Sequence, residues 1–211
     1  MDLNITYWGF GPLLAKTRVS PDLLTFLMVE GQKLKKEANT RLAGHIEKEL
    51  EYERNHQDIF IKMFYPYFKS YSDFLRNNWY QTAPRKVNPI PEKPNIMLHN
   101  LWINFMKSGE YNPYHRHGGD FSFVIYLDVP DNIHEENQKY IGTSAGPGAI
   151  DFIFGQVGQN DIATTSRYFL PHTGDLFLFP ACLSHSVAPF KSDVERVSVS
   201  GNISYFNDNK V

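Results

Sequence analysis

The spacing of apolar side chains divides the chain into two parts of different character. Between residues 1 and about 80, apolar positions recur at steps of three and four, as in the run from Leu23 to Met28, which favours amphipathic helices. Ser20-Pro21-Asp22 precedes this run in the order capping hydroxyl, proline and acid that begins many helices. A second helical region is expected from Ile59 to Leu75, where Pro66 is predicted to start a new helix.

From Ile96 onward the apolar runs are short and typical of strands. Turn signals such as Lys107-Ser108-Gly109 and Thr173-Gly174-Asp175 separate them. A proline-rich stretch from Ala83 to Pro94 connects the two parts, since proline breaks both helices and central strands. Short strands with turns at this spacing predict a mainly β fold, either a barrel or a jelly roll. The expected strands run over Met97 to Phe105, Phe121 to Val129, Ala149 to Phe154, Leu176 to Phe179 and Arg196 to Phe206.

This pattern predicts one compact unit made of two regions. Residues 1–95 would form a helical buttress and the proline-rich connector, with the helices packed on the barrel, and residues 96–211 would form the β core. A length of 211 residues, of which 42% are hydrophobic and 15% aromatic, supplies a core of sufficient size for such a unit.

Charge and cysteine content narrow the partners and the compartment. The formal net charge of -2, with both signs interspersed, indicates no general attraction to nucleic acid or to anionic membranes. The N-terminus does not resemble a signal peptide, and no apolar run approaches the ~20 residues of a membrane span. Cys182 is alone, so no internal disulfide is expected and a reducing compartment, the cytoplasm, is predicted.

Three histidines are the first residues with candidate chemistry. His115-Arg116-His117 precedes an expected strand, and residues two apart in extended chain project to the same side. His185 follows an apolar strand and a proline bend, at a separation from His117 that suits strands on facing sheets. Imidazole is a ligand for iron, copper, nickel and zinc, so the three side chains are candidates for one metal site. Half-exposed loop histidines are the alternative.

An Arg-x-Ser sequence adds a candidate carboxylate-binding site to the candidate metal site. Arg196 and Ser198 share one face of the last apolar run, opposite Val197. An arginine that points into a barrel is costly unless an anion meets it. Its planar fork matches a carboxylate bidentately, and the nearby hydroxyl can complete the clamp. The alternative is an edge-strand arginine that faces solvent.

Taken together, these residues resemble the Fe(II)/2-oxoglutarate-dependent oxygenase superfamily, in which a His, an acid two residues later, a distal His and an Arg-x-Ser follow in order. More narrowly, the chain is similar to small oxygenases of bacteria and bacteriophages in which His-x-His replaces His-x-Asp. The match extends over about residues 100–207, half the chain. It rests on Trp102-Ile103-Asn104, Gly109, His115-Arg116-His117, Ser122, Val124-Ile125-Tyr126-Leu127, Gly174-Asp175-Leu176, Phe179-Pro180, His185 and Arg196-Val197-Ser198.

The resemblance implies a fold, a metal and an activity. The fold would be a double-stranded β-helix, a cupin-like jelly roll with helices packed on the barrel. His115, His117 and His185 would hold Fe(II), and 2-oxoglutarate and O₂ would be the cosubstrates. The enzyme would oxidise, most simply hydroxylate, a small-molecule or peptidyl substrate and release succinate and CO₂. A homodimer formed through the N-terminal helices is a further alternative.

The resemblance also implies the residues that hold the cosubstrate. Arg196 with Ser198 would pair with the distal carboxylate of 2-oxoglutarate. Tyr126 shares a strand face with Ser122 and would present its phenol to the same carboxylate. Asn104 is a lesser candidate, for the cosubstrate or for a metal-bound water.

Three alternatives stay open at the level of sequence. Asp120 could supply a carboxylate ligand, with His117 outside the ligand set. The histidines could instead form a cupin-type site in a protein that does not use 2-oxoglutarate, although such a site has no need of a carboxylate clamp at Arg196 and Ser198. In a third reading the chain is a non-enzymatic jelly-roll interaction module whose histidines are incidental.

Overall fold

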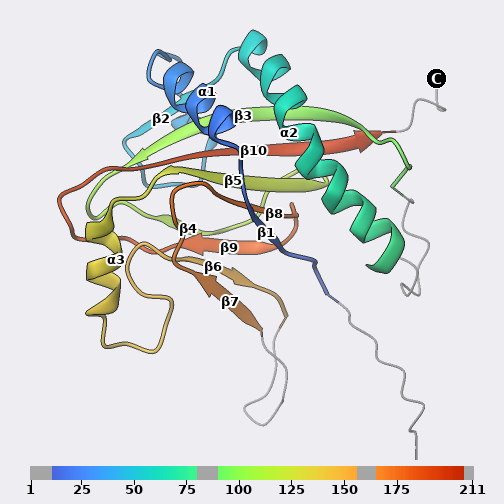
Figure 1. Cartoon of the computed structure of the whole chain (residues 1–211). Coiled ribbons are helices and arrows are strands. Elements are labelled where there is room, and N and C mark those ends of the chain that lie inside the picture. The colour runs from blue at the N-terminus through green and yellow to red at the C-terminus, as the bar shows by residue number, and fades with distance from the viewer. Residues whose placement is uncertain (1–10, 80–89, 156–164, 207–211) are drawn as a thin grey trace, which may run out of the picture.

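The computed structural model describes residues 11–79, 90–155 and 165–206. Its strands form two antiparallel sheets that face each other, and two helices from the N-terminal part of the chain cover the outer face of the larger sheet (Figure 1). This confirms the predicted fold class, a mainly β jelly roll with N-terminal helices. Part of the predicted connector, residues 80–89, lies outside the described residues.

In the N-terminal part of the chain, helices and strands alternate, and after it most of the elements are strands. The described helices are α1 (Pro21–Gly31), a 3₁₀ helix (Asn39–Arg41), α2 (Arg54–Phe74), a π-helical turn (Leu75–Trp79) and α3 (Asp131–Gln138). The described strands are β1 (Ala15–Arg18), β2 (Lys48–Glu51), β3 (Asn95–Met106), β4 (Asn112–His115), β5 (Phe121–Asp128), β6 (Ile150–Ile153), β7 (Ser166–Phe169), β8 (Asp175–Pro180), β9 (Ser184–Val187) and β10 (Arg196–Phe206).

The two sheets differ in size. The larger has the strand order β1-β8-β5-β10-β3-β2, and the smaller has the order β4-β9-β6-β7. Neighbouring strands pair antiparallel throughout both sheets. Strands β5 and β10 therefore take the two central places of the larger sheet, with β3 beside β10.

Strand β5 contributes side chains to two hydrophobic cores, one on each face of the larger sheet. Its side chains alternate, so that Phe121, Phe123 and Ile125 pack under the helices, while Val124 and Tyr126 point between the two sheets. Both faces are covered, which is why the strand is apolar almost without interruption. The inner core between the sheets is the one that contains the candidate site.

Helices α1 and α2 close the outer face of the larger sheet. At the start of α1, Ser20 Oγ accepts a hydrogen bond from Leu23 N at 3.3 Å and Pro21 occupies the first turn, as the sequence predicts. Along α2, Phe60 and Phe64 recur on one face and stack on Phe123 of β5, with ring centroids 5.2 and 4.6 Å away. These aromatic contacts hold the helices on the sheet that carries the site.

Two expectations for the N-terminal part are wrong. Pro66 lies inside α2 and starts no new helix, because the buried aromatic face of α2 continues past it and its own side chain faces solvent. The N-terminal part also contributes strands as well as helices. The four-residue strands β1 and β2 form the two edges of the larger sheet, and their polar sequences AKTR and KELE show no alternation that would identify them.

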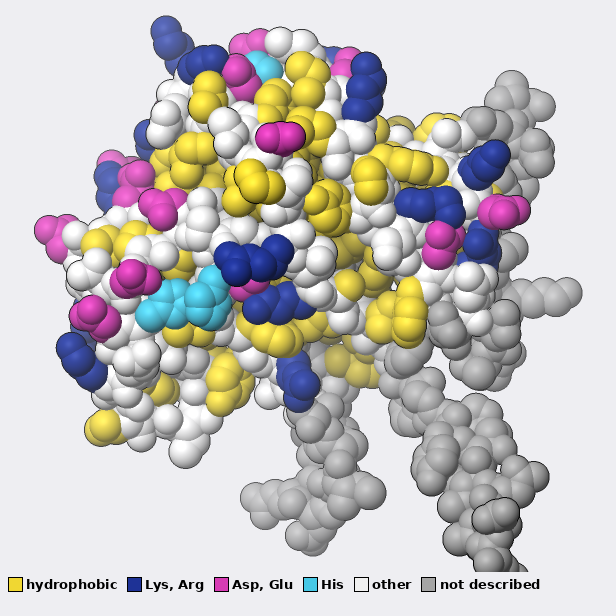
Figure 2. Space-filling model, in the orientation of Figure 1, with side chains coloured by type: hydrophobic (Ala, Val, Ile, Leu, Met, Phe, Trp, Pro, Cys, Tyr) yellow, Lys and Arg dark blue, Asp and Glu magenta, His cyan; other side chains and the backbone are white. Residues whose placement is uncertain are grey.

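The surface agrees with the charge pattern of the sequence. On the face shown in Figure 2, dark blue basic and magenta acidic side chains are interspersed among apolar ones. Within the described part of the chain, no helix is both long enough and apolar enough to cross a membrane.

Candidate functional site

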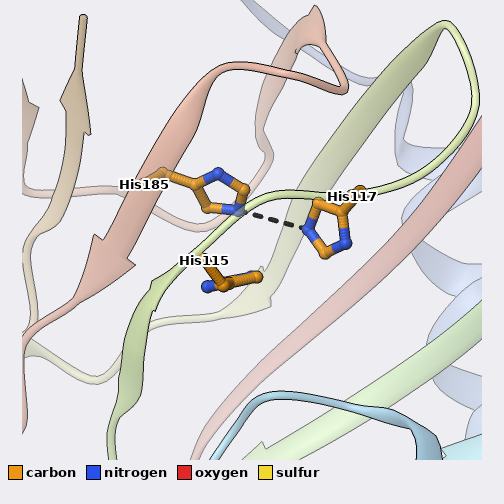
Figure 3. Close-up of side chains that lie close together, drawn as sticks. All are labelled: His115, His117 and His185. Atoms are coloured by element: carbon orange, nitrogen blue, oxygen red, sulfur yellow. Dashed lines mark hydrogen bonds between the residues drawn. The ribbon is translucent and has the colours of Figure 1, made fainter.

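Three histidines converge between the sheets. His115 ends β4 and lies opposite His185 on the neighbouring strand β9, while His117 follows β4 by two residues. Figure 3 shows the three rings turned toward one another. The expectation of facing sheets does not describe this cluster, because His115 and His185 lie on neighbouring strands of the smaller sheet and His117 lies in the connection from β4 to β5. Strand pairing brings His115 and His185 together, and the backbone hydrogen bond from His117 N to the carbonyl of Ala181 holds the third residue beside them.

The distances within this cluster suit a single metal ion. One ring nitrogen from each of His115, His117 and His185 lies within 4.8 Å of the others. The Nε2 atoms of His117 and His185 are 3.3 Å apart (Figure 3). An ion that binds imidazole at about 2.0–2.1 Å can join nitrogens up to about 4.2 Å apart, so the 3.3 Å pair fits as it stands and a pair as far apart as 4.8 Å would have to close by a few tenths of an ångström. Among the described residues, this is the one group of three or more His, Cys, Asp or Glu side chains with that geometry.

Backbone carbonyls set the orientation of two of the rings. The Nδ1 atom of His115 lies 2.6 Å from the carbonyl of Pro113, and that of His185 lies 3.0 Å from the carbonyl of Leu183. A carbonyl only accepts, so each Nδ1 carries the hydrogen and each Nε2 presents a lone pair. Ligating histidines in metalloproteins are commonly held by this kind of outer hydrogen bond.

Burial keeps the histidines neutral. It lowers the pKa of His117 to about 3 and the pKa of His185 to about 4, and the neighbouring imidazoles add to both effects. The pKa of His115 is lowered as well, chiefly by burial. A neutral imidazole is the form that binds a metal, so at neutral pH no proton competes for these nitrogens.

Asp120 lies apart from the cluster. Its side chain is exposed, and its Oδ2 accepts a hydrogen bond from the backbone N–H of Tyr205 at 3.1 Å. It does not belong to the group of converging metal-binding side chains in the described part of the chain. The geometry therefore favours three imidazoles over a set in which Asp120 replaces His117.

Arg196 is buried in the same space. It opens β10 with 3% of its surface exposed, its Nη1 donates to the carbonyl of Gly148 at 2.8 Å, and its Nη2 contacts the sulfur of Met106. Its Nε has no hydrogen-bond partner, and none of the described carboxylates forms an ion pair with it. A buried guanidinium of this kind requires an anion from outside the protein.

A row of polar side chains crosses the inner face of the larger sheet beside Arg196. Ser198 on β10 lies between Asn104 on β3 and Tyr126 on β5, in register with both. Asn104 Nδ2 donates to Ser198 Oγ at 3.4 Å, which leaves Asn104 Oδ1 without a partner in the described structure. The phenol of Tyr126 is fully buried, which raises its pKa to about 12 and keeps it a hydrogen-bond donor.

All seven predicted site residues line one pocket between the sheets. Apolar side chains from both sheets complete its wall. The predicted residues are Asn104, His115, His117, Tyr126, His185, Arg196 and Ser198, and the apolar wall includes Ile46, Trp102, Met106, Val124, Ile150, Phe179 and Val187.

Sequence reasoning missed one buried acid beside this pocket. Glu49 on β2 lies directly opposite Asn104, with 1% of its surface exposed. The sequence around it reads as a charged surface stretch, and only the pairing of β2 with β3 shows that its side chain is enclosed.

A comparison with protein families finds the same class as the sequence motifs. Residues 100–202 match the family described as "Putative 2OG-Fe(II) oxygenase". The match includes every residue of the pocket that the sequence predicted. No curated protein sequence matches the chain.

Solved structures show the same fold at low sequence identity. A prolyl-4-hydroxylase from Pseudomonas putida is 12% identical with a TM-score of 0.52, and the alignment covers 92% of this chain and 93% of that one. A prolyl hydroxylase from Trichoplax adhaerens, in complex with a peptide fragment of hypoxia inducible factor, is 12% identical with a TM-score of 0.52, covering 93% and 84%. The non-heme alpha ketoglutarate dependent epimerase SnoN from nogalamycin biosynthesis is 14% identical with a TM-score of 0.56, covering 92% and 77%.

The family match is to 2OG-Fe(II) oxygenases, and the fold is the one shared with the solved structures named above. The resemblance inferred from the sequence is thereby confirmed at the level of the family. Enzymes of this class use Fe(II), 2-oxoglutarate and O₂.

Proposed function

We propose, on the premise that residues 100–202 carry the sequence of the 2OG-Fe(II) oxygenase family, that this chain is an Fe(II)- and 2-oxoglutarate-dependent dioxygenase that hydroxylates a small-molecule or peptidyl substrate. One observation carries the proposal. A buried arginine without an anionic partner in the described structure lines the same pocket as three converging imidazoles. A metal-binding cupin would have a use for the histidines but none for this arginine.

The residues present fit the iron. His115, His117 and His185 would hold Fe(II), because their ring nitrogens converge and burial keeps them free of protons. Three imidazoles are neutral, whereas the usual pair of histidines with one acid contributes a negative charge. The iron would therefore keep more positive charge for the anionic cosubstrate to balance.

The residues also fit the cosubstrate. Arg196 and Ser198 would hold the distal carboxylate of 2-oxoglutarate, with the phenol of Tyr126 as an additional donor. Iron, 2-oxoglutarate and O₂ together supply the oxidising chemistry, and succinate and CO₂ are the products. The protein orients the cosubstrate through Arg196 and excludes water through apolar walls such as Phe179, whose ring centroid lies 4.9 Å from that of His185.

The proposal also includes the domain organisation, the cellular compartment and the substrate class. Residues 1–95 would support a catalytic core of residues 96–211, since α1 and α2 cover its outer face. The lone Cys182 supports a reducing compartment, the cytoplasm, in a bacterial or phage setting. The structurally similar proteins include a prolyl hydroxylase in complex with a peptide fragment and an epimerase from nogalamycin biosynthesis, so the fold accommodates both substrate classes.

Conversion of 2-oxoglutarate to succinate tests the proposal. The enzyme should be supplied with Fe(II), O₂ and 2-oxoglutarate at amounts comparable to the enzyme, so that even slow turnover without a substrate gives measurable succinate. We expect succinate from the wild type and none above background from His185→Ala. Equal succinate from the two proteins, or none from an iron-loaded wild type over many hours, would contradict the proposal.

A further inference from the structure

Four buried oxygen atoms beside the pocket have no hydrogen-bond donor in the described structure. Both carboxylate oxygens of Glu49 are among them, together with Oδ1 of Asn104 and Oδ1 of Asn112. All four are acceptors. A buried polar atom without a partner costs free energy, and an unpaired buried carboxylate costs more, so a donor is missing from this part of the molecule.

These atoms belong to the surroundings of the oxygenase pocket. Glu49 lies opposite Asn104, which in turn lies opposite Ser198, so the three side chains share the inner face of the larger sheet. Asn104 and Asn112 both line the pocket with the histidines. A Cβ atom placed on Gly44 would lie 3.0 Å from Glu49 Oε1 and 3.4 Å from Asn112 Oδ1, so both oxygens border the same small space.

Within the described part of the chain, no lysine, arginine or histidine pairs with the Glu49 carboxylate. Glu51, two residues along β2, is paired with Lys36 and Arg41, whereas Glu49 forms no ion pair with any described residue. Burial, with the charge of Glu110 as a smaller cause, raises the pKa of Glu49 to about 7. The carboxylate is therefore strained in the absence of a positive partner, and a neutral glutamine of the same shape would avoid that cost.

The cosubstrate is not the missing partner. 2-Oxoglutarate is a dianion, and Arg196 offers it a cation in the same pocket. An anion next to Glu49 would add repulsion to burial. A divalent ion such as Ca²⁺ takes about six to eight oxygen ligands, which is more than the four buried oxygens without partners in this described region, and a single carboxylate balances only half of its charge.

We propose that Glu49, with the side-chain carbonyls of Asn104 and Asn112, binds a protonated nitrogen of the substrate, an ammonium or guanidinium group. This inference rests on the proposed function and names the substrate class for it. The cationic group would be fixed by charge and by hydrogen bonds to several acceptors, while another part of the same molecule reaches the iron. The substrate is thus an amine or a guanidine, free or on a peptide side chain.

Calorimetric binding at pH 8, under argon and with Fe(II) and 2-oxoglutarate present, tests the charge preference. The probes are L-lysine and L-arginine, compared with the uncharged side chains of L-norleucine and L-citrulline. We expect wild type to bind at least one cationic probe about tenfold more tightly than its neutral counterpart, and Glu49→Gln to lose that preference. Glu51→Gln is the matched control and should keep it. Equal binding of charged and neutral probes by wild type, or an unchanged preference in Glu49→Gln, would overturn the proposal.

Thermal unfolding gives a second, independent result. In the metal-free protein at pH 8.5, Glu49→Gln should unfold at a higher temperature than wild type, because it removes an unpaired buried charge. A lower unfolding temperature would overturn the proposal, since Glu49 would then be a structural hydrogen-bond partner. So would stabilisation of wild type by Ca²⁺ or Mg²⁺ that Glu49→Gln abolishes, with no response to lysine or arginine.

The outcomes separate this inference from the function on which it rests. Loss of 2-oxoglutarate binding with the amine preference intact would leave an amine-binding pocket and remove the oxygenase. Intact 2-oxoglutarate binding without the amine preference would remove only the role of Glu49.

Discussion

Two hydrogen bonds to backbone carbonyls orient the histidine cluster for a metal ion. His115 and His185 each turn their Nδ1–H to a backbone carbonyl, which commits their Nε2 lone pairs to the pocket. His117 has no such bond in the described structure and is held instead through its backbone N–H, which donates to the carbonyl of Ala181 at 3.0 Å. The ligand set can therefore be tested most sharply at His117.

Replacement of His117 should separate the two candidate ligand sets. We expect His117→Ala to weaken Fe(II) binding at least roughly 10-fold, because one of three ligands is lost. Asp120→Ala should leave Fe(II) affinity within about twofold of wild type, since Asp120 accepts from Tyr205 and does not reach the cluster. Anaerobic titration with Fe(II) measures both. The reverse pattern would restore a carboxylate ligand.

The stability of the metal-free protein should fall in acid because of the same histidines. The folded-state pKa values of His117 and His185 are about 3 and about 4, against 6.5 for an ordinary histidine, so the unfolded chain binds more protons between these values. The stabilisation is complete above pH 6.5 and is lost as pH falls toward 4, by up to about 1.4 kcal/mol per pH unit for each histidine.

Urea unfolding at pH 7.5, 6.0 and 5.0 with a chelator present checks this slope. His117→Gln should flatten it, whereas His172→Gln, at an exposed histidine, should keep the wild-type slope. An equally steep slope in His117→Gln would show that the acid sensitivity comes from other groups.

At the scale of single residues, the sequence predicts those features of the site that depend on the spacing of nearby residues. Arg196 and Ser198, two residues apart, share a face of β10, and His117 continues the same two-residue spacing from His115 just beyond the end of β4. Their common pocket follows from that period. Glu49 could not be predicted, because its burial depends on β2 pairing with a strand about fifty residues away, and no local pattern reports such a pairing.

At the scale of elements, a strand is visible in the sequence when it is buried. β3, β5, β8 and β10 are apolar over most of their length and coincide with the predicted runs. β1 and β2 are short edge strands whose polar residues satisfy solvent, so their sequences resemble loops.

Pro66 is the element-scale prediction that failed, and it suggests a test. A proline inside a helix cannot donate a backbone hydrogen bond and crowds the preceding turn, yet α2 runs through it. We expect Pro66→Ala to raise the free energy of unfolding by about 1 to 2 kcal/mol, less than the full helix-propensity difference because the unfolded chain also gains freedom.

Chemical denaturation of Pro66→Ala against wild type measures this gain. Ser70→Ala, at another exposed position one turn further along α2, should change stability by only a few tenths of a kcal/mol. A loss of stability in Pro66→Ala would show that the ring packs usefully against the groove it lines with Tyr67 and Leu13.

On the scale of the whole molecule, the two hydrophobic cores have different functions. The outer core, between the helices and the larger sheet, is built mainly of apolar side chains and gives the sheet a rigid backing. The inner core, between the sheets, holds the polar side chains and the pocket. Because Arg196, Tyr126 and Asn104 come from three neighbouring strands of one backed sheet, their spacing is set by the sheet itself.

The most direct test is a calorimetric titration of 2-oxoglutarate into the Fe(II)-loaded protein under argon. The account predicts one binding site per chain in wild type and an affinity at least roughly 100-fold lower in Arg196→Ala, since two charge-assisted hydrogen bonds are lost. Arg167→Ala, at an exposed arginine on β7, should bind as wild type does. No binding by wild type, or equal binding by Arg196→Ala, would contradict the account.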